Sequence, residues 1–124
     1  MITCLAAFVA GAGLMVEPAA LPQEVAQDAA ALVQVQTPDE AFYAALADFT
    51  LDAEALSQAL RAAGASDDLP CIFHGIAEDA RVRALDLQAA ETADAQSRAM
   101  SGLRALLNDA ITLAPFAAEE LTSP

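Results

Sequence analysis

The chain of 124 residues contains no lysine and no tryptophan, and its five basic side chains are all arginines. Without lysine it lacks the phosphate-binding residue of a P-loop and the amine that forms Schiff bases. Against the five arginines stand 18 acidic residues, which leaves a formal net charge of −13. Affinity for a nucleic-acid backbone comes mainly from basic side chains, so no nucleic-acid partner is expected. An anionic membrane surface is disfavoured for the same reason.

Large aromatic side chains are scarce, because the chain has five phenylalanines and one tyrosine, whereas alanine supplies 33 residues. Even so, 56% of the residues are apolar. Disorder requires low hydrophobicity together with high net charge, so this chain is expected to fold. The abundance of alanine predicts a thin, closely packed helical core.

Cysteine is also rare, with only Cys4 and Cys71 in the chain. If the amino-terminal segment is removed, Cys71 has no intramolecular partner and packing alone must hold the domain together. If the segment is retained, the two cysteines can pair only where the fold brings them together.

The first sixteen residues carry no charge, and an acidic residue and two prolines follow them within six positions. This apolar run is shorter than the roughly 20 residues that span a bilayer, and it contains many small residues, as a secretory signal does. We therefore expect residues 1–20 to be a secretory signal segment that is cleaved after Ala12 or Ala20. The mature protein is then periplasmic or secreted and keeps no stable membrane anchor.

One feature of a signal is missing, because the first basic side chain is Arg61 and no positive n-region precedes the apolar run. The alternative is a cytoplasmic helical oligomer that retains the segment in an interface between subunits. The amino terminus of the protein recovered from its host distinguishes these two hypotheses.

Residues 21–36 are rich in alanine and glutamine with weak periodicity, which predicts a linker or a loosely docked helix. We expect a single helical domain over residues 37–124. At its start, Thr37 is a candidate N-cap, Pro38 occupies a position that needs no amide donor, and Glu40 can reach back to the cap.

Helical spacing of apolar residues continues along the domain. We expect the first helix to end near Asp48, Thr50 to cap a second helix, and Gly64 to stop that helix. Further along, Val82 and Leu85 share one face of the next amphipathic helix with Ala89.

The longest apolar pattern covers residues 93–114, with Thr92 as the expected N-cap and Pro115 as the expected end. No alternating strand pattern, internal repeat or glycine-rich loop occurs. The sequence therefore predicts an all-α fold, a small bundle or array of four to five amphipathic helices preceded by an apolar amino-terminal segment.

A metal site is one candidate function, because Cys71, His74 and Glu78 lie close together in the sequence. On a helix these residues fall within about 60° of one another, and thiolate, imidazole and carboxylate are all zinc ligands. No fourth ligand is identified, and any helix with polar residues at this spacing gives the same pattern. An ordinary helix surface is the alternative, and we expect no cofactor.

No catalytic constellation stands out either. Cys71 and His74 are neighbours in sequence, whereas catalytic cysteine and histidine usually come from distant parts of a fold. Adjacent acidic pairs occur, but none has the alternating oxygen ligands and central glycine of a calcium loop. We therefore expect that the protein is not an enzyme.

The remaining function is binding. A small, acidic, exported helical domain is typical of a protein that docks to another protein. We expect it to bind and modulate a partner in the cell envelope that carries a basic or apolar patch, for example the extracytoplasmic domain of a membrane sensor. Residues 17–60 carry eight acidic residues and no basic one, so a basic partner is expected to approach this half.

The expected contact surface collects apolar residues, the only histidine and a glycine beside the loop that ends at residue 70. It comprises Leu69, Cys71, Phe73, His74 and Gly75. The alternative is that this segment only packs the helices against one another.

Overall fold

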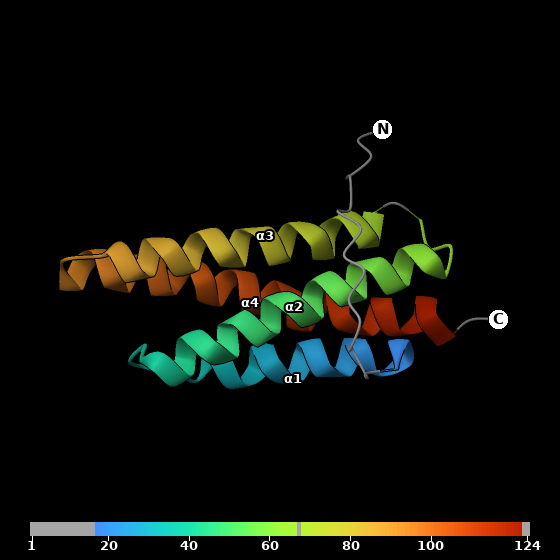
Figure 1. The fold of residues 1–124 in the computed structure, drawn as a ribbon, viewed down its shortest axis with the longest axis horizontal. Coiled ribbons are helices and arrows are strands. Elements are labelled where there is room, and N and C mark those ends of the chain that lie inside the picture. Colours follow the sequence, from blue (N-terminus) through green and yellow to red (C-terminus); the bar gives the residue numbers. More distant parts are fainter. Residues whose placement is uncertain (1–16, 67, 123–124) are drawn as a thin grey trace.

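Four helices follow one another in the computed structural model, which describes residues 17–66 and 68–122. They are α1 (Leu21–Val33), α2 (Glu40–Ala62), α3 (Asp68–Ala89) and α4 (Ala93–Thr122), and a short 3₁₀ turn, η1 (Pro18–Ala20), precedes α1. Consecutive helices run in opposite directions (Figure 1). Each helix packs mainly on its two neighbours around the bundle, so that α1 contacts α2 and α4, and α3 contacts the same two helices. The predicted all-α fold is confirmed, with four helices and no strand in the described part of the chain.

The core is formed by residues that recur at alternating intervals of three and four, which keeps them on one side of each helix. In α2 they are Phe42, Leu46, Phe49, Ala53, Leu56 and Leu60, and in α4 they are Met100, Leu103, Leu107, Ala110, Ala114 and Ala117. The last three of these positions in α4 are alanines, which agrees with the thin core expected from the composition.

The first helix is part of this core. Val25, Ala29 and Leu32 on α1 are buried, and α1 packs against both α2 and α4. The expected linker or loosely docked helix is therefore an integral helix, and the core begins well before residue 37. Its apolar positions are diluted by alanine and glutamine, which is why the periodicity in the sequence is weak.

The N-cap of α2 lies two residues beyond the expected one. Asp39 has an extended backbone, and its Oδ1 accepts a hydrogen bond from the Phe42 backbone N–H at 2.9 Å. Thr37 is therefore not the N-cap. Aspartate ranks above threonine at this position, because its carboxylate accepts the amide hydrogen bond and favours the positive end of the helix dipole.

No break occurs in α2 near Asp48, where two helices were expected. Thr50 is buried inside the helix, and its hydroxyl donates a hydrogen bond to the Ala47 carbonyl at 2.7 Å. The hydroxyl therefore caps nothing. The predicted end of the helix is confirmed, because Gly64 has a φ of 78° and follows the C-cap residue Ala63.

In α4, the expected N-cap is confirmed and the expected end is wrong. The Thr92 hydroxyl accepts a hydrogen bond from the Ala95 backbone N–H at 3.1 Å. Pro115, however, lies inside the helix, which continues to Thr122. The buried positions continue in register past the proline, so packing keeps this last part helical although the ring removes one backbone donor.

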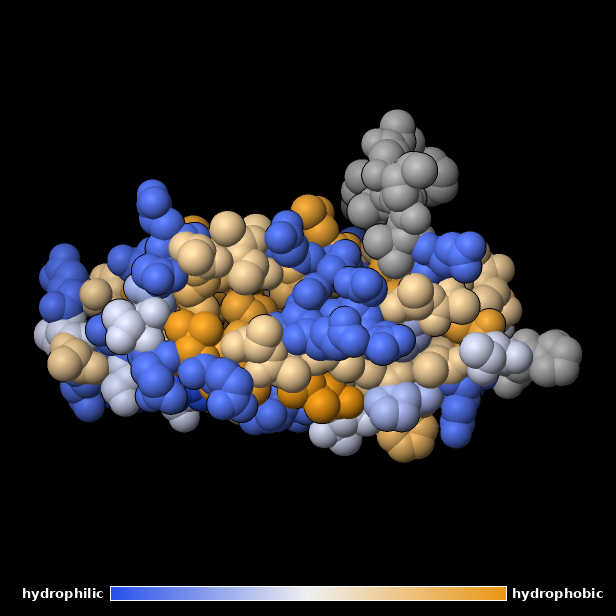
Figure 2. All heavy atoms as spheres, turned by 90° about the horizontal axis from the view of Figure 1, so that it is seen from below, coloured by the Kyte–Doolittle hydropathy of each residue, from blue (hydrophilic) through white to orange (hydrophobic). Residues whose placement is uncertain are grey.

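The face of the bundle on which α1 lies mixes hydrophilic and hydrophobic groups (Figure 2). Hydrophilic residues gather near the middle of this view, and hydrophobic residues lie between them and the polar residues at one end. None of the described helices is both long and apolar enough to cross a membrane. The secretory signal expected over residues 1–20 falls largely outside the described residues, because residues 1–16 are not among them.

Candidate functional site

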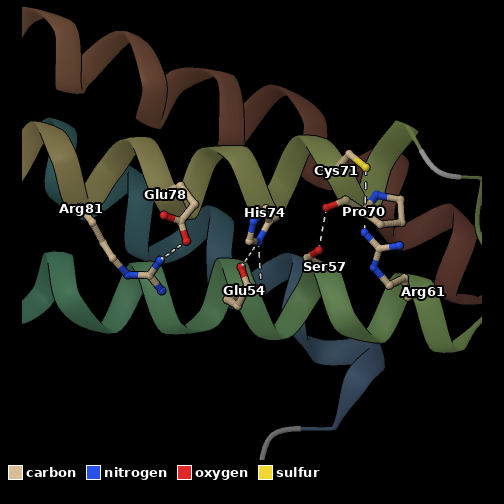
Figure 3. A network of polar contacts seen from close by, with 8 residues as sticks. All are labelled: Glu54, Ser57, Arg61, Pro70, Cys71, His74, Glu78 and Arg81. Carbon is tan, nitrogen blue, oxygen red and sulfur yellow. Dashed lines mark hydrogen bonds and ion pairs between the residues drawn. The ribbon is translucent and has the colours of Figure 1, made fainter. Parts of the chain in front are cut away.

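Helices α2 and α3 are joined by polar contacts over several turns (Figure 3). The hydroxyl of Ser57 is fully buried and donates a hydrogen bond to the Pro70 carbonyl at 2.6 Å. One turn away, His74 Nδ1 lies 2.8 Å from Glu54 Oε2. A carboxylate only accepts hydrogen bonds, so Nδ1 carries the hydrogen in this pair. These contacts fix α3 against α2 and determine which side of α3 faces solvent.

The structure does not bring together the three residues of the hypothetical metal site. His74 pairs with Glu54, whereas Glu78 accepts a hydrogen bond from Arg81 at 2.8 Å. Cys71 is disulfide-bonded, and the other cysteine of the sequence, Cys4, lies outside the described residues. A disulfide sulfur offers no thiolate to a metal, so the geometry lends the hypothesis no support.

The expected contact surface is divided between core and surface. Phe73 is 0% exposed and belongs to the core cluster, as the packing alternative required. Leu69, Cys71, His74 and Gly75 are half-buried. A side chain added at Gly75 would meet open space, so α3 is accessible to a partner at this point.

One side of α3 beyond Gly75 carries exposed apolar residues. Val82 is 55% exposed and Leu85 is 66% exposed, and Ala89 is also exposed. The sequence placed these three residues on one face, and the structure turns that face toward solvent. We call Val82, Leu85 and Ala89 the α3 outer stripe. Gly75 lies two helical turns before Val82 and therefore on the same side of the helix.

The α3 outer stripe borders a groove between α2 and α3. The groove has a volume of about 400 Å³, and Leu85 forms part of its wall. The residues that line it are mostly apolar or small; they are Tyr43, Leu46, Ala47, Thr50, Ala80, Arg81, Ala84, Leu85 and Gln88. Its volume lies in the range of about 300 to 1,000 Å³ that ligand pockets commonly have.

Acidic residues surround the stripe. Glu78, Asp79 and Asp86 are all exposed and lie within one turn of Val82 along α3. Of the two arginines nearby, Arg81 pairs with Glu78, and Arg83 is turned toward Gly102 on α4. The solvent side of this helix is therefore apolar along the stripe and acidic beside it.

A second group of acids lies between α1 and α2. Carboxylate oxygens of Glu24, Asp28 and Asp52 come within 4.8 Å of one another, and in the described chain no other set of three potential metal ligands converges in this way. Burial raises the pKa of Asp28 from 3.8 to about 7. A hydrogen bond with Asp52 and the charges of Asp52, Glu24 and Asp48 act in the same direction. Convergence of carboxylates does not by itself indicate a bound cation, so we assign no metal site here.

Sequence reasoning missed the groove and the acidic group for a common reason. Tyr43 and Leu85 are 42 positions apart in the sequence, and Asp28 and Asp52 are 24 positions apart. Only the order in which the helices pack brings such pairs together. For the α3 outer stripe and the groove beside it, the sequence offered one signal, which was the regular spacing of Val82, Leu85 and Ala89.

No family model matches the chain, and no curated protein or solved structure matches it. Its function therefore has to be argued from its own surface.

Proposed function

We propose that the protein is a binding protein that docks a basic amphipathic helix of a partner protein along the α3 outer stripe and thereby modulates that partner. The observation that carries the proposal is the exposure of Val82, Leu85 and Ala89 in regular helical register. Their helix already buries its opposite side, including Phe73 and Ala80, so the bundle does not need this second apolar face.

The shape of the surface supports a helix as the occupant. Contiguous exposed apolar residues with a polar rim are typical of protein interaction sites. A helix that lies along the stripe can place side chains spaced by three and four residues into the groove between α2 and α3. Tyr43 and Leu85 on opposite walls then contact the same inserted side chains.

Charge supports a basic partner. The chain carries a net charge of −13, and Glu78, Asp79 and Asp86 rim the stripe. On the α2 side, the residues that line the groove lie between Tyr43 and Thr50, within the stretch of residues 17–60 that contains no basic residue. A second copy of this chain would bring an equally acidic surface, and like charges oppose such an association. Lysine and arginine beside an apolar seam would instead pair with the rim.

The cell envelope is the proposed location of the partner. This part of the proposal rests on the apolar segment over residues 1–20 and its resemblance to a secretory signal. The docking surface itself does not depend on the compartment.

A designed peptide tests the proposal without knowledge of the natural partner. The probe is a fluorescein-labelled helical peptide of leucine and lysine, with leucine repeating at three- and four-residue intervals. A second peptide has the same composition in scrambled order, so it keeps the charge and loses the apolar face. Fluorescence anisotropy at physiological salt should show saturable binding of the first peptide and at least tenfold weaker binding of the second.

Variants locate the binding site. The double variant Val82→Gln/Leu85→Gln should weaken binding at least tenfold, because each buried aliphatic side chain contributes about 1.5 to 3 kcal/mol. Phe116→Gln is the matched control, since Phe116 is 54% exposed on another helix. Equal affinity of the double variant and the native protein would refute the proposal. A dimer in sedimentation that the double variant disperses would assign the stripe to a second copy and would also refute it.

A further inference from the structure

The α1–α2 connection and the beginning of α4 lie at the same end of the bundle, away from the start of α3 (Figure 1). Residues of both segments line a polar cavity. Its volume is about 270 Å³, at the small end of the range for ligand pockets. Its walls are largely polar, and they consist of Gln36, Thr37, Pro38, Ala93, Gln96, Ser97, Met100 and Arg104. A small polar molecule fits such a cavity better than an apolar one.

Arg104 is the only charged residue in the wall of this cavity. Its Nη2 donates a hydrogen bond to the Val35 carbonyl at 2.9 Å, which holds the guanidinium in place. Its Nε is buried and has no hydrogen-bond partner among the described residues. Because Nε is closed to solvent, a ligand in the cavity would meet the Nη donors of the guanidinium, whose fixed planar arrangement matches a carboxylate.

The positive charge of Arg104 is not neutralised by the described residues, although acids greatly outnumber arginines in the chain. Arg81 pairs with Glu78 and Arg98 with Asp94, whereas no ion pair joins Arg104 to a described acid. Two acids next to cavity residues in the sequence are engaged elsewhere: Asp94 pairs with Arg98 at 3.1 Å, and the Asp39 carboxylate caps α2. The cavity therefore presents a cation without a counterion.

The remaining walls favour the same kind of ligand. The first two turns of α4, through Ala93, Gln96 and Ser97, form one side of the cavity, and the positive end of a helix dipole lies at such a start. The amides of Gln36 and Gln96 can donate or accept hydrogen bonds from polar substituents. Charge and hydrogen-bonding capacity thus point to an anion that also carries polar groups.

We propose that this cavity binds a small polar carboxylate, which the Arg104 guanidinium holds and the neighbouring amide and hydroxyl side chains orient. The site is separate from the α3 outer stripe and does not depend on the proposed docking of a helix. The ligand class is a short-chain di- or tricarboxylate or a hydroxycarboxylate.

Heteronuclear NMR on the full chain tests the site, because it detects weak binding residue by residue. The probes are succinate and citrate, with succinamide as a neutral analogue and sulfate as an inorganic anion. Saturable shifts confined to residues 36–38 and 93–104 with the carboxylates, and absent with succinamide, are expected. No saturable shift, or shifts spread over the whole chain, would overturn the proposal. Equal affinity for sulfate would overturn the carboxylate assignment.

Three variants separate binding from folding. Arg104→Gln should weaken carboxylate binding by roughly 10- to 100-fold, as loss of charge-assisted hydrogen bonds implies. Arg83→Gln is the matched control for loss of a positive charge, since Arg83 is not among the residues that line the cavity, and it should bind normally. Because Arg104 also holds the Val35 carbonyl, Ser97→Leu provides a second variant that narrows the cavity and leaves this hydrogen bond intact. Unchanged binding in both Arg104→Gln and Ser97→Leu would refute the site.

Discussion

Asp28 shows how the acidity of the chain acts on a single side chain. Burial, a hydrogen bond with Asp52 and the charges of Asp52, Glu24 and Asp48 together raise its pKa from 3.8 to about 7. Its Oδ2 is buried and has no hydrogen-bond partner within the part of the chain that the structure describes. The folded state therefore binds a proton more tightly than the unfolded state between these two pKa values. Below pH 3.8 the Asp28 carboxyl is protonated in both states and costs no stability. The free energy of unfolding falls as the pH rises from 3.8 toward and through 7, because the folded state then has to ionise this group.

Replacing Asp28 with asparagine tests this pH dependence. Asp28→Asn removes the ionised carboxylate and keeps a group that can hydrogen-bond to Asp52. Because Asp28 is partly exposed, solvent screens much of the repulsion, and we expect a gain on the order of 1 kcal/mol at pH 8 and almost none at pH 4. Urea denaturation at the two pH values measures the difference. Asp109→Asn, at an exposed position on α4, is the control. A gain that is the same at both pH values would contradict the assignment.

At the scale of the helix, Pro115 is the residue that fits helix propensity least, because it lies inside α4. Proline inside a helix is about 3 kcal/mol less favourable than alanine, because it lacks an amide donor and its ring crowds the preceding turn. Pro115 is exposed on a helix that continues to Thr122. Pro115→Ala should therefore stabilise the protein by about 1 to 3 kcal/mol. The gain is reduced by the conformational entropy that the unfolded chain acquires when proline is replaced.

Thermal and urea denaturation measure the effect of Pro115→Ala. Thr112→Ala, at an exposed position one turn earlier, serves as the control for an ordinary change of helix propensity and should alter stability by roughly 0.5 kcal/mol at most. Stabilisation no larger than that of the control would mean that the proline is compensated by its packing beside α1, where it lines a shallow groove with Pro22.

Element boundaries were predictable from the sequence where a cap acts alone. Thr92 and Gly64 are cap residues with no competing signal nearby, and the structure confirms both. Prediction failed where tertiary packing outweighed a local signal. Thr50 resembles an N-cap, but the buried positions of α2 continue in register past it, so the helix is uninterrupted. Pro115 likewise predicts the end of a helix, but the buried positions of α4 continue in register past it, so the helix extends to Thr122.

The candidate sites were less predictable than the fold. The apolar spacing of Val82, Leu85 and Ala89 was visible, but periodicity does not say which face of a helix a bundle buries. The buried side of α3 is the one that carries Phe73 and Ala80. On that side Ser57 and His74 make polar contacts between α2 and α3 that join residues 13 and 20 positions apart. The cavity around Arg104 depends on a contact with Val35 across 69 positions. No local motif reports such a pairing.

At the scale of the whole molecule, the bundle separates its two candidate surfaces. The α3 outer stripe runs along the side of the bundle, whereas the Arg104 cavity lies at one end, beside the α1–α2 connection. Acidic residues outnumber arginines 18 to five in the chain, and Arg104 lies in a polar cavity without an ion pair to a described residue. An occupant of one surface leaves the other accessible, which allows a small carboxylate and a partner helix to be tested independently.

The amino terminus of the mature protein is the remaining prediction at this scale. If residues 1–20 hold a cleaved signal, the packing of the bundle limits where cleavage leaves a stable domain. Leu21 is buried at the start of α1, and η1 packs against α1 and α4. Removal of the residues up to Ala12 spares both contacts but takes away Cys4, so the disulfide of Cys71 can then no longer form within one chain. Cleavage after Ala20 also removes η1. We therefore expect the mature chain to begin at Gly13 and to be recovered from the cell envelope or the medium.

Intact-mass analysis of the protein from its host measures this start directly. A chain that begins at Gly13 lacks Cys4, so Cys71 has no second cysteine within the same chain. Its mass should then gain no hydrogens from an internal disulfide on reduction. A chain that begins at Met1, found in the cytoplasm, would refute export. Retention of Met1 together with a gain of two hydrogens on reduction would show an intramolecular disulfide, and the amino-terminal segment would then belong to the folded protein.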